Sequence, residues 1–225
     1  MMTLTAHPLF GLFISFAAYM LSMLFAKRVK HPLANPLLIS TIIIIALLKW
    51  LNIPLENYMV GGSMINLMML PAIAVLAVSI YRQAAVLKAY FWPLVIGCLV
   101  GSITSMTSVW LMCRTFQLDD SLTAALIPKS VTTAIAVEIA RARGGIVAIT
   151  IVAVLFSGFV GAIFAPTLIR IMKIKDPVIA GVAIGTSSHA LGTSKAIEIG
   201  EVEGAMSSLS IGVAGLITAL LTLLF

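Results

Sequence analysis

The chain has 225 residues, of which 61% are hydrophobic and only 10% charged, and its mean hydropathy is +1.15. This composition leaves too little polar surface to coat a soluble globule, so it indicates a membrane protein in contact with the lipid bilayer. The formal net charge of +6 comes without a basic run or an aromatic platform. We therefore expect no nucleic-acid partner, and a positive-inside topology accounts for the charge.

Apolar runs of spanning length recur along the chain, whereas a barrel would need short alternating strands. The sequence predicts an all-α polytopic membrane protein with about six spanning helices plus two broken or re-entrant segments in an inverted repeat. No His, Cys, Asp or Glu residues have metal-ligand spacing, and no Ser lies in a GxSxG context. We expect no metal, no cofactor and no enzyme activity.

The first apolar run, Leu9 to Ala26, predicts a retained helix with its N-terminus outside. No Lys or Arg precedes this run and a basic stretch at 27–30 follows it, which reverses the charge order of a signal peptide. A second helix is predicted from residue 31 to about Trp50. At its start, Asn35 either belongs to the cap or offers a polar side chain to a substrate path, and the capping interpretation is favoured.

A third helix is predicted from about Ser63 to Tyr81, after a short polar loop over residues 52–62. Pro71 lies in the middle of this helix. An interior proline frees a carbonyl group and kinks a membrane helix, so Pro71 either lines a pathway or only shapes the packing.

A fourth helix is predicted over about residues 89–112. It carries Gly97 and Gly101 in GxxxG spacing, which favours close helix contact and gives weak support for a homo-oligomer. Cys98 and Cys113 lie in or at the end of this run and are interpreted as small core residues.

Two polar segments, residues 121–140 and 177–200, interrupt the apolar chain. In the first, polar residues cluster around Pro128, where the bilayer midplane would fall, which predicts a helix broken near that proline. In the second, the break is predicted at Leu191-Gly192. At a constant offset the two segments match at Thr133/Thr193, Ala136/Ala196, Glu138/Glu198, Ile139/Ile199 and Gly144/Gly204.

An apolar helix follows each polar segment, over residues 145–172 and 204–225, with a hinge at Glu201 and Glu203 before the second. If both polar segments re-enter the membrane rather than cross it, Lys and Arg lie in larger excess inside, which favours the re-entrant topology. The predicted regions are a four-helix scaffold and oligomer region at 1–120 and a transport region at 121–225, with repeat units of about 121–172 and 177–225.

The predicted breaks would leave free N–H groups at the starts of half-helices near Ser130 and Thr193. Each such end carries roughly half a positive charge, and two converging ends would make an anion pocket for a small carboxylate. Lys129 and His189 occupy equivalent positions, and both can carry a proton. The predicted binding residues are Lys129, Ser130, Thr132, Thr133, His189, Gly192, Thr193 and Ser194.

Each of these residues also has a structural alternative. Ser and Thr in membrane helices often bond to their own backbone or hold neighbouring helices together. His189 could cap a helix end or take part in proton coupling. Glu138 and Glu198 could relay protons, but both lie near segment ends, and the structural interpretation is favoured. The candidate ion pairs are Glu138 with Arg141 and Glu198 with Lys195.

The run Pro128-Lys129-Ser130-Val131-Thr132-Thr133, followed by Ser188-His189-Ala190-Leu191-Gly192-Thr193, resembles the LrgB/CidB family of bacterial inner-membrane proteins, also called YohK-like. The resemblance covers nearly the whole chain and includes Asn35-Pro36 and Pro71-Ala72. Two departures from the family pattern are Ala134, where a second proline is usual, and the pair Ser194-Lys195, which adds a cation beside the site.

The resemblance implies a bacterial inner-membrane location and a small LrgA/CidA-like membrane partner. Family members are described as antiholin-like or holin-like regulators of murein hydrolase export and lysis. A plastid relative whose C-terminal half is LrgB-like exchanges glycolate and glycerate. We expect a secondary transporter of small monocarboxylates such as glycolate, glycerate or pyruvate, coupled to protons and working by alternating access. The alternative is the antiholin-like regulator.

Overall fold

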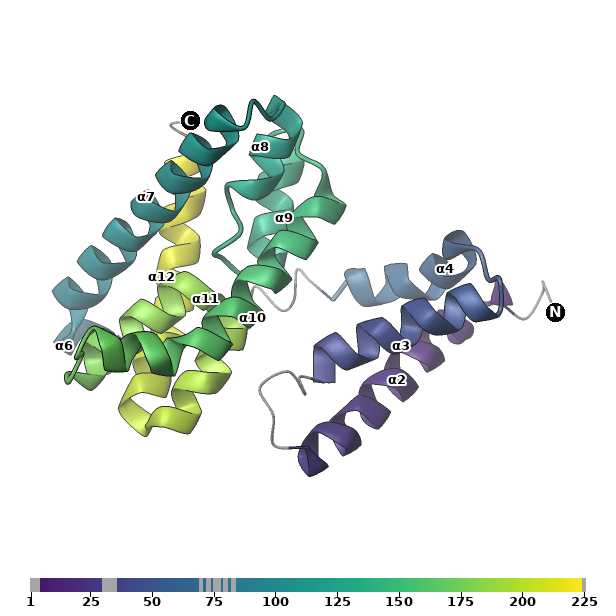
Figure 1. Ribbon diagram of the computed structural model, residues 1–225, viewed down its shortest axis with the longest axis horizontal. Helices are drawn as coiled ribbons and strands as arrows, with labels where there is room; N and C mark the ends of the chain where they lie inside the picture. Colours follow the sequence, from purple (N-terminus) through teal and green to yellow (C-terminus); the bar gives the residue numbers. More distant parts are fainter. Residues whose placement is uncertain are drawn as a thin grey trace. The chain divides into compact units, whose positions relative to one another are not determined.

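The computed structural model describes residues 5–29, 36–68, 71, 74, 78, 81 and 84–223 (Figure 1). All regular structure in these residues is helical, in agreement with the predicted fold class. The chain divides into two compact units, Met1–Ala72 and Ile73–Phe225. The two units are described separately below.

The first unit contains α2 (Pro8–Arg28), α3 (Pro36–Trp50) and α4 (Leu55–Asn66), and α2 packs against both of the others. The backbones of α2 and α4 touch at Gly11 and Gly61, where no side chain would fit. One turn away the Ser15 and Tyr58 hydroxyls are 2.8 Å apart. The prediction of a loop over residues 52–62 was therefore wrong, because the glycines allow this stretch to pack as a helix on α2.

Two residues singled out in the sequence, Asn35 and Pro71, lie in or beside parts of the chain outside the described residues. Asn35 lies outside the residues that the structure describes. Pro71 is helical and exposed, but most of its neighbours also lie outside the described residues. The third helix does not begin at Ser63 as predicted, because residues 63–66 belong to α4 and residues 67–68 form a turn. The pathway role of Asn35 and Pro71 stays a prediction.

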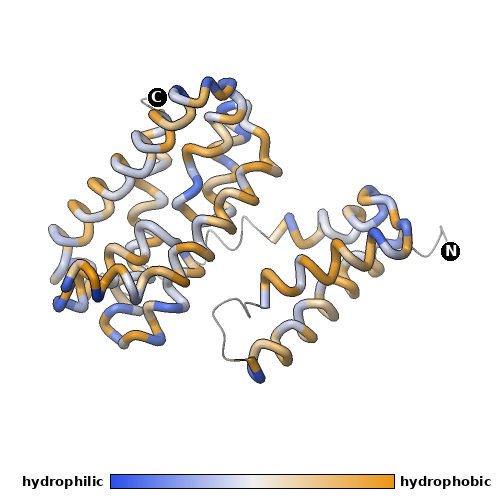
Figure 2. Tube along the Cα trace, in the orientation of Figure 1, coloured by the Kyte–Doolittle hydropathy of each residue, from blue (hydrophilic) through white to orange (hydrophobic). Residues whose placement is uncertain are grey.

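The second unit contains α6 (Ala84–Ala89), α7 (Phe91–Thr115), α8 (Asp120–Leu126), α9 (Thr133–Ala142), α10 (Val147–Ile171), α11 (Pro177–Ile199) and α12 (Glu201–Thr222). Of the described helices, α2, α7, α10 and α12 are long and apolar enough to cross a membrane, and α3 is a shorter apolar helix. Figure 2 shows hydrophobic residues along these helices and many of the hydrophilic ones at turns and helix ends. These spans agree with a membrane protein, although they are fewer than the six expected.

Helices α8 and α9 form a hairpin, residues 120–142, which we call the first hairpin (Figure 1). Asp119 caps α8 by accepting a hydrogen bond of 2.7 Å from its first turn. Just after α9, a Cβ atom added to Gly145 would lie 2.8 Å from the Ala125 nitrogen, so the end of α9 returns to α8. Pro128 is fully buried in the turn between the two helices.

Helix α11 forms a second hairpin, because His189 breaks it with φ 42° and ψ −141°. Its first half, residues 177–188, runs beside α7. Its second half, residues 190–199, turns back, since Ala196 packs in one cluster with Ile184 of the first half. The contacts that fix this path are Val182 with Gly97, Thr186 with Gly101 and Thr193 with Ser207.

The two hairpins enter the unit from opposite ends of α12. Arg143, at the end of the first hairpin, donates a hydrogen bond to the Thr222 carbonyl oxygen in the last turn of α12. Near the start of the second hairpin, an added Cβ at Gly181 would lie 2.6 Å from the Glu203 carbonyl oxygen in the first turn of α12. Helix α10 connects the end of the first hairpin to the start of the second.

The predicted break positions need correction. The half-helix expected to start near Ser130 starts at Thr133, because turn hydrogen bonds such as Val131 N–H to Pro128 O occupy the residues between. The second break lies at His189, not at Leu191-Gly192. Gly192 is helical and is needed for space, since an added Cβ would lie 2.4 Å from Ser188 Cβ.

The boundary after the second hairpin also differs by a few residues. Gly200 is extended, with φ −176° and ψ 163°, and separates α11 from α12. Glu201 and Glu203, predicted as a hinge, lie in the first turn of α12, where carboxylates interact favourably with the helix dipole.

Helix α7 packs on α11 and α12 within the second unit. The predicted division at residue 120 therefore separates α7 from helices that it contacts. As a division of function between scaffold and transport region it stays a prediction.

Candidate functional site

The tips of the two hairpins meet at one turn of α10. Val131 of the first tip packs in a cluster with Val154, and the His189 Nε2 of the second tip lies 2.9 Å from the Val154 carbonyl oxygen. Gly158, one turn further along α10, leaves space for the imidazole, since an added Cβ would lie 2.5 Å from His189 Cε1. Two distant breaks in the sequence therefore lie together.

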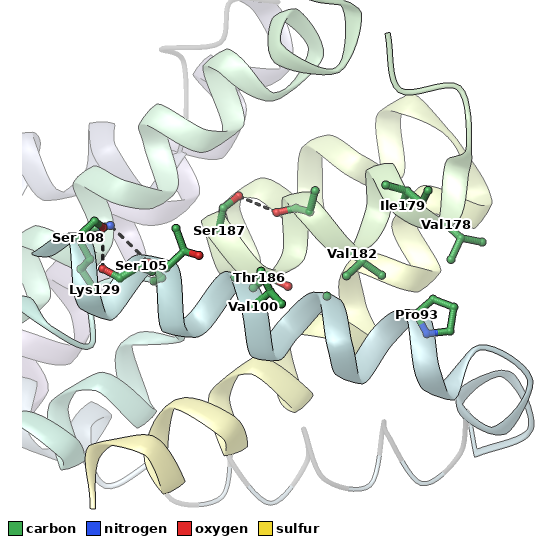
Figure 3. A pocket seen from close by; sticks show the side chains of 15 residues that line it. Pro93, Val100, Ser105, Ser108, Lys129, Val178, Ile179, Val182, Thr186 and Ser187 are labelled. Carbon is green, nitrogen blue, oxygen red and sulfur yellow. Dashed lines mark hydrogen bonds between the residues drawn. The ribbon is translucent and has the colours of Figure 1, made fainter. Parts of the chain in front are cut away.

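A pocket of about 560 Å³ lies between α7 and the first half of α11, with the first hairpin's tip at one end (Figure 3). At that end the Lys129 Nζ donates to Ser130 Oγ over 3.4 Å, and the Ser130 and Ser105 hydroxyls are 2.6 Å apart. Among the described residues that line this pocket, Lys129 is the only charged one. The further hydroxyls in its lining belong to Thr104, Ser108, Thr186 and Ser187.

Only part of the predicted site lies in the pocket. Lys129 and Ser130 line it directly. Thr132 and Thr133 are half-buried at the start of α9, where Thr132 is the N-cap residue without a side-chain capping bond. The first N–H groups of α9 have no intrahelical acceptor, so they are available to a nearby anion.

The predicted residues of the second segment do not line the pocket. His189, Gly192 and Thr193 are buried. The Thr193 hydroxyl donates to the His189 carbonyl oxygen over 2.9 Å and lies 2.7 Å from the Ser207 hydroxyl. Ser194 is exposed and bonds back to the Ala190 carbonyl oxygen. For Thr193 and Ser194, the structural alternative describes the observed bonds.

The two glutamates form the ion pairs that the sequence suggested. Glu138 pairs with Arg141 at 2.5 Å, and Glu198 pairs with Lys195 at 2.6 Å, each between residues three apart on one helix. Both carboxylates are at least half exposed. Solvated pairs of this kind contribute little to stability.

Sequence reasoning missed the contribution of α7 to the pocket. Gly97, Gly101, Ser105 and Ser108 recur every three or four residues and therefore share one face of α7. This spacing was interpreted only as a possible oligomer contact through the GxxxG pair. In the structure the face packs on α11, and the continuing series of small polar residues was the signal for a lined pocket.

Comparison with known proteins identifies the family. The model of the LrgB-like family matches residues 15–225. The chain belongs to the LrgB-like family. Members of this family from three Bacillus species are similar over essentially the whole chain. No solved structure matches it.

The three similar proteins are each named antiholin-like protein LrgB. The Bacillus mycoides protein is 36% identical over 225 residues, covering 100% of this chain and 98% of its own length. The Bacillus subtilis protein is 36% identical over 222 residues, covering 98% and 96%. A Bacillus cereus protein is 36% identical over 225 residues, covering 100% and 98%.

Proposed function

We propose that this LrgB-like protein is a secondary transporter of small monocarboxylates. The observation that carries the proposal is the meeting of two opposed hairpin tips at Val154, beside a pocket with one cation. Interrupted segments that enter from opposite ends and meet inside the membrane are characteristic of transporter sites. The matched segments and their opposite directions support an inverted repeat of units 121–172 and 177–225.

In this proposal the substrate carboxylate accepts hydrogen bonds at the polar end of the pocket. The Lys129 ammonium supplies charge, and the Ser130 and Ser105 hydroxyls supply further donors. The free N–H groups at the start of α9 add to the positive potential. A cation surrounded by neutral hydroxyls suits one carboxylate because it leaves no second charge unpaired.

Proton coupling is assigned to Lys129 and His189. Both side chains can carry a proton, and they lie on the two hairpin tips that meet at Val154, so the protonation of one can depend on the charge of the other. Glu138 and Glu198 are less suited, because they lie in exposed ion pairs outside the pocket lining. The substrate would reach the site from either side of the membrane by alternating movement of the hairpins.

The setting that we propose is the bacterial inner membrane, with the N-terminus outside. Homo-oligomers and a separate LrgA/CidA-like membrane partner complete the proposal.

A second candidate is an antiholin-like regulator of lysis. The similar Bacillus proteins are named antiholin-like, which favours this second candidate directly. In that role the polar tips would serve helix association, and the pocket would need no soluble acid.

Uptake of labelled pyruvate, glycolate and glycerate into liposomes holding the purified protein, with and without a pH gradient, tests the proposal. We expect saturable uptake that falls by at least about tenfold in Lys129→Gln, since a charge-assisted bond is lost. Lys195→Gln is the matched control, because Lys195 lies outside the pocket lining in an exposed ion pair. If the folded protein takes up none of these acids, either alone or together with the LrgA/CidA-like partner, the antiholin-like role is favoured.

A further inference from the structure

We propose that the pocket prefers monocarboxylates that carry an unbranched apolar tail of about eight to twelve carbons over two- and three-carbon acids. This inference rests on the proposed function, in which small acids are transported, and names a longer class of monocarboxylate that the same pocket binds more tightly. It follows from the shape and lining of the pocket, which has one polar end and one apolar end.

The two ends are separated along α7. Figure 3 shows Lys129, Ser105 and Ser108 at one end of the pocket and Pro93 and Val178 at the other. On α7, the rise from Pro93 to Ser108 corresponds to roughly 20 Å at 1.5 Å per residue. The Lys129 ammonium and the Ser105 and Ser108 hydroxyls therefore lie at one end of an elongated space, and Thr186 and Ser187 lie between the two ends.

The apolar end of the pocket offers no hydrogen-bonding side chain to a small hydroxy acid. Its walls are formed by Pro93, Val178, Ile179 and Val182, with Val100 between the two ends. These side chains present no hydrogen-bond donor or acceptor to a guest. A methylene chain would displace water from this surface. The burial of apolar surface would then favour binding.

The volume of the pocket also exceeds that of a three-carbon acid. Such an acid has about six non-hydrogen atoms, and at about 30 Å³ each it fills roughly 180 Å³. The pocket holds about 560 Å³. An acid of eight to twelve carbons, with about 10 to 14 non-hydrogen atoms, fills roughly 300 to 420 Å³.

The charge balance restricts the guest to a single carboxylate. Lys129 is the only cation among the described residues that line the pocket. A dicarboxylate of similar length would place its second charge against Val178 and Val182, where no partner compensates the loss of hydration.

Binding to the protein in lipid nanodiscs tests the inference. Labelled straight-chain acids from acetate to tetradecanoate are titrated against discs with and without protein, and affinity is expressed relative to the free aqueous acid. We expect affinity to rise about fourfold per CH₂ and then level off near twelve carbons. Partition into empty discs keeps rising with chain length, so the limit identifies a site of fixed length.

Two variants and a matched control locate the tail. Ala183 is exposed and lines the pocket, so Ala183→Trp fills it without displacing a buried side chain. We expect this variant to move the chain-length limit to shorter acids, and Lys129→Gln to weaken the binding of every acid. Ala148→Trp adds the same bulk at an exposed position of α10 outside the pocket lining. This control should change neither the chain-length limit nor the affinity for the acids.

The possible results separate the inference from the proposed function. Pyruvate uptake without saturable decanoate binding, or an unchanged chain-length limit in Ala183→Trp, would overturn the inference and leave the carrier intact. Neither uptake nor binding of any acid would overturn both. Displacement of decanoate by phosphatidic acid at lower concentration would assign the pocket to a membrane lipid and overturn the inference.

Discussion

His189 combines two roles at the tip of the second hairpin. Its imidazole bonds to the Val154 carbonyl oxygen, and its backbone makes the sharp turn that separates the halves of α11. A positive φ costs a residue with a Cβ atom about 1–3 kcal/mol, so the surrounding contacts must hold this conformation. Residues held in this way often lie at functional sites.

Comparison of His189→Gly with His189→Ala isolates the backbone contribution. Both variants lose the imidazole, but only glycine adopts φ 42° without strain. We expect His189→Gly to be more stable than His189→Ala by about 1–2 kcal/mol in thermal unfolding in detergent.

The matched control is Ser194, an exposed residue of α11 beyond the break. There Ser194→Gly should be less stable than Ser194→Ala by about 1 kcal/mol, because glycine weakens a regular helix. The same order at both positions would show that His189 is not strained.

At the residue scale the sequence located part of the site. Lys129 and Ser130 were predicted because polar residues in an apolar segment are rarely without a role. The left-handed conformation of His189 could not be predicted, since it depends on packing against Gly158 of a distant helix. Thr193 and Ser194 were predicted to bind substrate, but their hydroxyls make the bonds within the protein that the structural alternative described.

At the scale of elements, the two broken helices were predicted from composition and offset alone. Proline and clustered polar residues mark where a membrane helix is interrupted. They do not fix the turn itself, and the second predicted break was therefore displaced from His189. The helix α4 was missed because Gly61 and Gly62 suggest a loop until their contact with α2 is known.

The GxxxG pair of α7 gives a prediction at this scale. An added Cβ at Gly101 would lie 2.5 Å from Thr186 Cγ2, so Gly101→Val should disturb the packing of α7 on α11. We expect a loss of about 1–3 kcal/mol in stability with an unchanged oligomeric mass by light scattering.

Val100→Ile adds bulk on an exposed position of the same helix and serves as the control. Dissociation of an oligomer by Gly101→Val, without loss of thermal stability, would instead place this face between subunits.

At the scale of the whole molecule, the class and family were predicted correctly. An apolar composition indicates a helical membrane protein, and the resemblance carried by the two motifs agrees with the LrgB-like family model, which matches residues 15–225. The orientation of the helices in the membrane was harder to predict from the sequence. The excess of Lys and Arg on the inside differs little between the crossing and the re-entrant topology.

The opposed hairpins predict which loops share a side of the membrane. Cysteines at Asp120 and Ala142 should react with an impermeant maleimide from one side, and cysteines at Lys175 and Glu201 from the other. All four positions are exposed, and the native cysteines are buried, so the wild-type protein is the control. If both segments crossed the membrane, the two members of each pair would react from opposite sides.

The central claim is that the pocket beside the hairpin tips is a transport site. Ser187 lines it and is exposed, which suits Ser187→Cys for labelling by an impermeant thiol reagent applied from each side in turn. We predict reaction from both sides, slowed by the transported acid, because alternating access exposes one site to two compartments. Reaction from one side only, or a rate that no carboxylate changes, would contradict the account.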